Sequence, residues 1–319
     1  MVRYEEVQAR GVLNPVRGMG FRWSLNPYRG CTHGCHYCFA RRYHSYLDLN
    51  PDRSFESVIF VKVNAPAVLR EELARPSWRR ELVAIGTATD PYQPVEGRYR
   101  LTRGILEILA EFRTPASLVT KGTMVVRDRD VLAELGRRAS ATVSISLTTL
   151  DRDLWRRLEP GTPPPEQRLR AMGELARVGI RAGVLLAPIV PGLTATPRHL
   201  APLLRAAADH GARFVVPNLL YLKPGVKEHF EAFLAAEAPD LLPLYRRLYP
   251  GAYAPRAYGG GRAGAARTLA DEGAALNADS PREASAPRYT RSAARPPVAC
   301  RAGPLRVSRL SAGAPLKPG

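Results

Sequence analysis

Three of the four cysteines in this 319-residue chain lie close together, at Cys31, Cys35 and Cys38. The spacing C-x3-C-x2-C lets one short loop direct all three sulfurs to one centre. Gly30 and Gly34 give that loop backbone freedom, because glycine adopts positive φ without a steric penalty. Three thiolates without a fourth leave one iron of an iron–sulfur cube without a protein ligand, just as a catalytic zinc keeps one open position. The loop therefore predicts a metal centre that can react.

Clustered thiols can also form disulfides or bind zinc. Paired disulfides are not expected, because the cluster is odd in number and no apolar signal region precedes it. A structural zinc site would need a fourth ligand, which His33, His36 or His44 could supply, so zinc stays open as an alternative. Free clustered thiols fit a reducing cytoplasm. No apolar run is long enough to predict a membrane span.

The cysteine spacing, with the aromatic Tyr37 just before the third cysteine, resembles the signature of the radical S-adenosylmethionine enzymes. The resemblance implies that Cys31, Cys35 and Cys38 hold a 4Fe–4S cluster whose fourth iron is chelated by S-adenosylmethionine. It also implies an electron donor such as flavodoxin or ferredoxin. With that electron the enzyme would reductively cleave S-adenosylmethionine to a 5′-deoxyadenosyl radical.

Apolar strands alternate with amphipathic helices along most of the chain. This alternation, at a spacing of roughly 30 residues, predicts an α/β fold with a parallel sheet. Six such units fit a partial (β/α)6 TIM-like barrel, the shape that the resemblance also implies, while a doubly wound open sheet is the alternative. We expect strands at residues 21–26, 58–63, 82–86, 116–120, 141–147, 180–186 and 213–219, and helices at 39–49, 64–73, 103–112, 127–138, 166–178, 197–210 and 227–236.

Composition divides the chain into three parts. Residues 1–20 contain scattered Gly and Pro and are expected to form an irregular lead-in, and residues 21–250 are expected to form the barrel. Residues 251–319 form a basic tail, rich in Ala, Arg, Pro and Gly and without periodicity, which we expect to be disordered. Cys300 lies in this tail, far from the other thiols, and is not an expected ligand.

The chain carries a formal net charge of +18. The last 69 residues hold eleven basic and four acidic residues, so the first 250 carry 36 − 25 = +11. An excess of this size favours a polyanionic partner, DNA or RNA, through electrostatic steering. An organism whose proteins are generally rich in Arg would also produce such an excess of positive charge.

Both folds place the active site at the carboxyl ends of the strands. There Asp90 could accept hydrogen bonds from an ammonium group, or could be a turn residue before Pro91. Lys121 needs an anionic partner such as a carboxylate, although exposed lysines are common. The hydroxyls of Ser144 and Ser146 could form hydrogen bonds with ribose or a carboxylate, or could form them with other groups in the protein core. The resemblance implies cofactor contacts for these residues, with Thr89 and Asp90 at the methionine amino group and Ala187, Pro188 and Ile189 flanking the adenine.

Within the superfamily, segments such as CTHGCHYCFAR, LVTKG, VSIS, LEPGTPPPEQRL and LLAPIV follow the order seen in the spore photoproduct lyase family. The match covers roughly residues 21–235 and implies a lyase-like enzyme of DNA repair, which would lift a base from the stack. The chain departs from that family at residues 86–96, which lack the family's radical-relay cysteine. The hydrogen would then come from elsewhere, with Tyr92 or the substrate itself as candidates. A protein, peptide or small-metabolite substrate is one alternative, and a non-enzymatic, zinc-stabilised nucleic-acid-binding module is another.

Overall fold

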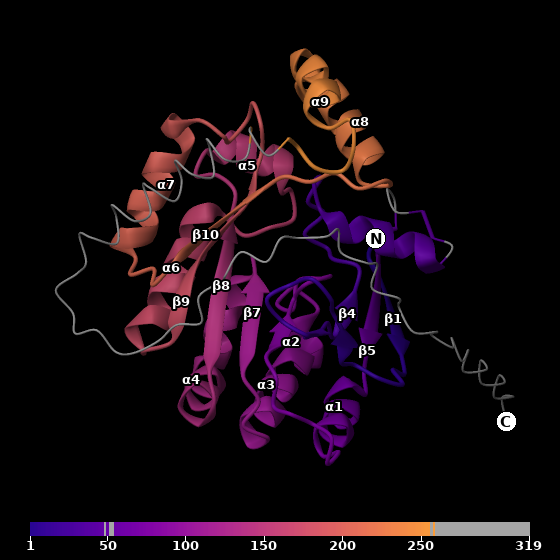
Figure 1. The fold of residues 1–319 in the computed structure, drawn as a ribbon, viewed down its shortest axis with the longest axis vertical. Coiled ribbons are helices and arrows are strands. Elements are labelled where there is room, and N and C mark those ends of the chain that lie inside the picture. Colours follow the sequence, from indigo (N-terminus) through magenta and orange to yellow (C-terminus); the bar gives the residue numbers. More distant parts are fainter. Residues whose placement is uncertain (48, 51–53, 256–257, 259–319) are drawn as a thin grey trace, which may run out of the picture.

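The structure is a computed structural model, and it describes residues 1–47, 49–50, 54–255 and 258. Its main sheet is mostly parallel, in the strand order β10-β9-β8-β7-β6-β3-β2 (Figure 1). Only β2, at one edge, runs antiparallel to its neighbour. The strands of this sheet are β2 (Asn14–Pro15), β3 (Trp23–Leu25), β6 (Val83–Ile85), β7 (Ala116–Thr120), β8 (Ala141–Leu147), β9 (Arg181–Ile189) and β10 (Val215–Leu219).

Helices separate the parallel strands, as the alternation predicted. Proline near the first residue fixes the start of three of them, because its missing N–H is not needed there. The helices beside the sheet are α1 (Ala65–Leu73), α2 (Glu96–Tyr99), α3 (Leu101–Glu111), α4 (Arg129–Arg138), α5 (Arg152–Leu158), α6 (Pro165–Arg177) and α7 (Pro197–Asp209), with 3-10 turns η1 (Phe39–Leu47) and η2 (Thr123–Asp128). The predicted α/β fold is confirmed, and since no pairing joins β10 to β2 in the described residues, the barrel is partial.

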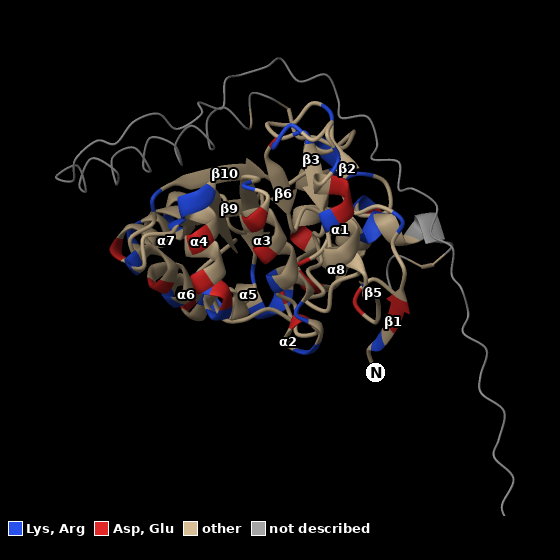
Figure 2. Ribbon diagram, turned by 90° about the horizontal axis from the view of Figure 1, so that it is seen from below, with Lys and Arg blue, Asp and Glu red and all other residues tan. Residues whose placement is uncertain are grey.

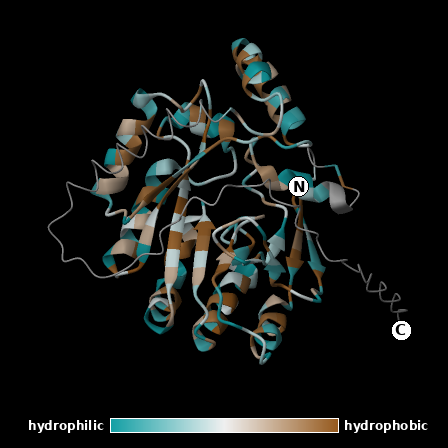
Figure 3. Cartoon of the chain, viewed as in Figure 1, coloured by the Kyte–Doolittle hydropathy of each residue, from teal (hydrophilic) through white to brown (hydrophobic). Residues whose placement is uncertain are grey.

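The two faces of the sheet differ in chemistry. On β8, Val143, Ile145 and Leu147 belong to the main hydrophobic core, which also contains residues of α1, α3, α4, α6 and α7. Ser144 and Ser146 alternate with them and therefore face the other side. The colouring of β7 and β8 in Figure 3 changes along each strand between brown, for hydrophobic residues, and near-white, for residues of intermediate hydropathy. One face of the sheet thus packs against helices, and the other face carries polar side chains that can contact a ligand.

A second sheet, in the order β1-β5-β4, lies beside the first (Figure 1). It corrects the expectation that residues 1–20 are irregular, because β1 (Arg3–Val7) pairs in parallel with β5 (Val58–Lys62). The Gly and Pro residues of the lead-in lie after β1 and leave it free to pair. Strand β4 (Tyr28–Arg29) pairs antiparallel with β5 and leads directly into residues 30–38, which we call the cysteine loop.

The last described helices, α8 (Lys227–Glu237) and α9 (Leu242–Leu248), are joined by the 3-10 turn η3 (Pro239–Leu241) and stand apart from the sheet (Figure 1). They supply Phe230, Leu234 and Tyr245 to a hydrophobic cluster that includes Cys35 and Tyr37. This helix pair thus covers one side of the cysteine loop. No helix in the described residues is long and apolar enough to cross a membrane. The expected disordered tail lies almost wholly outside the described residues.

Candidate functional site

The three cysteines follow β4 and line one cavity of about 200 Å³. All three are free thiols, with Cys31 and Cys35 buried and Cys38 half-buried. Gly30 has a φ of 84° and lies so close to β5 that a Cβ there would come within 2.6 Å of the Val58 carbonyl oxygen. Only glycine fits this turn, which brings Cys31 to the cavity.

Hydrogen bonds hold the cysteine loop from two sides. Buried Arg41 donates to the carbonyl of Cys35 at 3.1 Å and to that of Gly34 at 2.9 Å. From the segment after α5, the amide of Gly161 donates to the carbonyl of His33 at 3.0 Å. The approach is close, because a Cβ on Gly161 would lie 2.3 Å from the Thr32 carbonyl oxygen. The loop is therefore held in place before any cofactor binds.

The donor set fits an iron–sulfur cluster. Iron–sulfur clusters are held by cysteine thiolates, and three thiols converge here. Burial raises the pKa of Cys31 well above its ordinary value, and burial raises that of Cys35 to about 12. Thiolates at these positions thus need a strongly positive partner in the cavity. Among the described residues, no three His, Cys, Asp or Glu side chains form a group that could hold a single metal ion.

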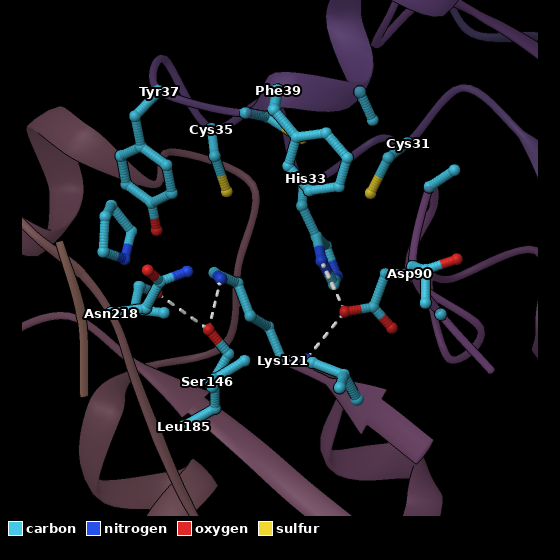
Figure 4. Close-up of a pocket in the computed structure, with 18 of the residues that line it drawn as sticks. Cys31, His33, Cys35, Tyr37, Phe39, Asp90, Lys121, Ser146, Leu185 and Asn218 are labelled. Carbon is cyan, nitrogen blue, oxygen red and sulfur yellow. Dashed lines mark hydrogen bonds and ion pairs between the residues drawn. The ribbon is translucent and has the colours of Figure 1, made fainter. Parts of the chain in front are cut away.

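The remaining walls of the cavity come from the carboxyl ends of the sheet strands (Figure 4). The loop after β6 supplies residues 86–90, β7 supplies Val119 and Thr120, and Lys121 follows directly after β7. Strands β8, β9 and β10 supply Ser146, Ala187 and Asn218. The cysteines thus face the strand ends across the cavity, as expected for a parallel sheet of this kind.

Asp90 is engaged by the protein itself. Its Oδ1 accepts hydrogen bonds from Thr120 Oγ1 at 2.6 Å and from the Tyr92 amide at 2.8 Å. Its Oδ2 accepts from the Lys121 amide at 2.7 Å and lies 3.3 Å from His33 Nδ1 (Figure 4). Burial alone would raise the pKa of Asp90, but His33 and these hydrogen bonds lower it to about 2. Asp90 therefore joins the end of β7 to the cysteine loop.

Lys121 directs its charge into the cavity. Its Nζ donates to Ser146 Oγ at 2.7 Å, and Ser146 in turn donates to the carbonyl of Ala187 at 3.1 Å (Figure 4). The same nitrogen lies 5.6 Å from the centre of the Tyr37 ring and 3.8 Å from Glu159 Oε1. The Lys121 side chain keeps 13% of its surface exposed, so the ammonium group can take an anionic ligand as a further partner.

A buried polar network lies beneath Lys121. Glu159 accepts hydrogen bonds from Tyr37, from Thr148 at 2.8 Å and from the guanidinium of Arg168. Burial would raise the pKa of Glu159, but the charges of Arg168 and Lys121 lower it to about 2. The network fixes the aromatic ring that precedes Cys38 and one wall of the cavity.

Some predicted site residues do not reach the cavity. Ser144 lies on the same face as Ser146 but two residues nearer the start of β8, and it is not part of the lining. Ile189 is fully buried in the main core, whereas Ala187 and Pro188 line the cavity. Tyr92 is also buried in that core, and its hydroxyl donates to Asp128 Oδ2 at 3.0 Å.

The other predicted residues lie at the cavity. Thr89 lines it, although its hydroxyl donates to the carbonyl of Gly30 at 2.5 Å. Thr87 and Ala88 line the wall where the resemblance would place a relay cysteine. The described lining residues therefore include no thiol besides those of the cysteine loop.

Sequence reasoning missed four residues of this site. His33 was considered only as a zinc ligand, yet it is buried in the cavity wall beside Asp90. Glu159 and Arg168 fall in the segment LEPGTPPPEQRL, which carries part of the family resemblance but for which the sequence predicts no role of any single residue. Asn218, at the end of β10, could have been found by the strand-end rule that identified Lys121.

Comparisons with family models and with known proteins gave several matches. A family model described as Radical SAM superfamily matches residues 25–201. An uncharacterized protein of Mycobacterium tuberculosis is 44% identical over 261 residues, which are 81% of this chain and 77% of that protein. A radical SAM Nα-GlyT isomerase of Pseudomonas phage M6 is 28% identical over 189 residues, which are 58% of this chain and 37% of the isomerase.

A solved structure shares the fold. A mutant of spore photoproduct lyase with bound AdoMet and dinucleoside spore photoproduct gives a TM-score of 0.58 at 17% identity. The match covers 73% of this chain and 66% of that lyase, so the chain spans just under two thirds of the lyase's length. At this identity the likeness shows the fold alone.

Proposed function

Since the chain belongs to the radical SAM superfamily, and is therefore an enzyme that uses a 4Fe–4S cluster and S-adenosylmethionine, we propose that its substrate is a nucleic acid. Membership of this superfamily excludes the non-enzymatic zinc-stabilised module. It also implies a reductant, and we propose a flavodoxin or a ferredoxin. When bound, the cluster and S-adenosylmethionine supply a 5′-deoxyadenosyl radical that abstracts hydrogen from an unreactive carbon.

The proposed roles of the residues follow from the cavity. Cys31, Cys35 and Cys38 hold the cluster. Lys121 binds the carboxylate of S-adenosylmethionine, because it carries a partly exposed positive charge into the cavity. The side chains of Thr89 and Asp90 act by positioning the cysteine loop and β7, since their oxygens already have partners in the protein.

The adenine is proposed to lie against Ala187 and Pro188, small residues that line the cavity at the end of β9. Ile189 supports this wall from the core side. Closure of the cavity matters, because the protein must exclude water from a reactive intermediate.

The observation that carries the nucleic-acid proposal is the charge. Outside the last 69 residues the chain still holds 36 basic and 25 acidic residues, and a net charge of +11 attracts a polyanion. The outer helices α3, α4 and α6 carry acidic residues among their basic ones (Figure 2) and together hold seven basic and six acidic residues, so most of the excess lies elsewhere in the chain. The lyase that shares this fold has been solved with a dinucleoside, which supports the same substrate class.

The reaction is proposed to differ from thymine-dimer cleavage that uses a relay thiol. Thr87 and Ala88 occupy the cavity wall where such a thiol would stand. Tyr92 is a poor substitute, because it is buried in the core and donates to Asp128. The hydrogen is therefore proposed to return from the substrate or the cofactor.

The ligand assignment is tested by Cys35→Ala, with Cys300→Ala as the matched control. Cys35→Ala should abolish assembly of the cluster and release of 5′-deoxyadenosine, because two thiolates cannot hold the cube. Cys300→Ala should leave both unchanged. Iron and sulfide content and the visible spectrum after anaerobic reconstitution provide the measurement. A fully loaded and active Cys35→Ala protein would contradict the assignment.

The substrate class is tested by the release of 5′-deoxyadenosine from the reconstituted protein with dithionite and S-adenosylmethionine. Addition of UV-irradiated or untreated oligonucleotides should raise the rate several-fold, because a bound substrate completes the closed cavity. Peptide and metabolite pools serve as controls. Stimulation by one of those pools, with none by DNA or RNA, would show that the substrate is a peptide or a metabolite and would contradict the proposal.

A further inference from the structure

A series of aromatic rings leads from the cavity to the surface and has no part in the roles proposed above. We name Phe39, Tyr221 and Tyr253 the mouth series. Phe39 and Tyr221 line the cavity. Tyr253 does not, and 51% of its surface is exposed. The series therefore links the reaction chamber with solvent.

The rings of the mouth series are arranged for stacking. The centres of Phe39 and Tyr221 lie 5.7 Å apart with an interplanar angle of 35°. Tyr221 and Tyr253 also lie 5.7 Å apart, and their planes differ by only 24°. Distances and angles in this range are those of favourable aromatic pairs. A flat ligand could continue the series at its exposed end.

The backbone holds the outer pair in place. Tyr221 and Tyr253 face each other across an isolated antiparallel bridge. Next to it, the amide of Leu222 donates to the carbonyl of Ala252 at 2.8 Å. Tyr253 is thus a fixed residue whose large exposed ring is not explained by packing. Exposed rings on a rigid frame bind flat ligands at a low cost in conformational entropy.

The charge around the mouth series suits an anionic chain. Residues 29–47, which carry Phe39, contain three arginines and no acidic residue. Arg41 is fully buried and paired with Glu56, whereas Arg29 and Arg42 are partly exposed. Residues 213–227, which carry Tyr221, contain one arginine, two lysines and no acidic residue. Among these, Arg42 influences the Tyr221 hydroxyl electrostatically. Aromatic rings beside cationic residues are the combination that binds single-stranded nucleic acids.

We propose that the mouth series stacks an unpaired nucleobase next to the base that reacts, so that the substrate enters as a single strand or as a locally opened duplex. This inference rests on the proposed nucleic-acid function and specifies it. The phosphates supply affinity through the basic segments, and the stacked base sets the position of its neighbour in the cavity.

The test uses the full-length, reconstituted protein and two fluorescent 12-mers: oligothymidylate and the same backbone with abasic sites throughout. Tyr253→Ala should weaken binding of oligothymidylate about tenfold, because one stacked base loses its platform. It should leave binding of the abasic strand unchanged, since the phosphates are the same. Tyr253→Trp should retain or strengthen the binding of oligothymidylate.

Tyr4→Ala is the matched control, because Tyr4 is also an exposed tyrosine but lies on β1, outside the mouth series. It should bind both strands as the unaltered protein does. Equal affinity of Tyr253→Ala and the unaltered protein for oligothymidylate would overturn the inference but not the proposed function. Equal losses on both strands would also overturn it. If the unaltered protein failed to bind DNA or RNA oligonucleotides at low salt, both the stacking inference and the proposed nucleic-acid function would be wrong.

Discussion

At the scale of single residues, Glu159 and Arg168 show how the cavity depends on a buried charge pair. Their side chains are 2% and 1% exposed, and the guanidinium of Arg168 donates to Glu159. Glu159→Gln should lower the free energy of unfolding by about 3 kcal/mol, because it leaves a buried guanidinium without a counter-charge. Urea denaturation of the protein without cofactors measures this change.

Glu166→Gln provides the comparison, because Glu166 also pairs with an arginine but in an exposed position. Arg152 and Glu166 are 60% and 43% exposed. An exposed pair of this kind contributes less than about 1 kcal/mol. If the two substitutions had the same effect on unfolding, burial would not be what makes the Glu159 pair important.

The cavity residues that were predicted correctly are those whose position follows from the local sequence. Cysteine spacing predicted the loop, and the ends of strands predicted Lys121 and Ser146 at the cavity. Ile189 was predicted to flank the adenine, but it is not among the residues that line the cavity, because β9 runs through it and its side chain alternates with Pro188 towards the core. Tyr92 lies in a loop, where no periodicity tells which way a side chain points.

At the scale of elements, the contact between the segment after α5 and the cysteine loop is set by one glycine. Gly161→Ala would place a Cβ 2.3 Å from the carbonyl oxygen of Thr32, and the two segments must separate. We expect a loss of about 1–3 kcal/mol in unfolding free energy and faster loss of iron to a chelator. Denaturation and iron release measure the two effects.

Gly136→Ala is the control within the same protein. Gly136 lies in α4, and a Cβ there would meet no atom within 4 Å. This substitution should stabilise the protein by about 1 kcal/mol, because alanine favours the helix, and should leave iron release unchanged. Faster iron release in Gly136→Ala as well would show that the effect is not specific to the loop contact.

The helices and strands that were predicted show a clear local pattern in the sequence, whereas β1 depends on a contact with a distant part of the chain. Strands β7 and β8 and helices α4 and α6 have strong periodicity and were found with nearly correct ends. Strand β1 was missed, because it is stabilised by pairing with β5, more than 50 residues away. Helix α5 was also missed, although Asp151 caps it by accepting from the amides of Asp153 and Leu154.

At the scale of the whole molecule, the sheet and its helices follow from the alternating pattern, but the cover of the cysteine loop does not. Helix α8 was predicted as a further unit of the repeat. Instead, α8 and α9 stand apart from the sheet (Figure 1), and their side chains share a hydrophobic cluster with Cys35 and Tyr37. Apolar spacing shows that a helix will be buried, but not which surface it will cover.

This cover has a consequence for the order in which the protein is made. His36, in the cysteine loop, contacts His229 of α8, and 193 residues separate them. A ribosome adds about 5–20 residues per second, so the thiols emerge roughly 10–40 s before the helix that encloses them. During synthesis there is thus an interval in which the loop is accessible to the cell's iron and sulfide delivery machinery.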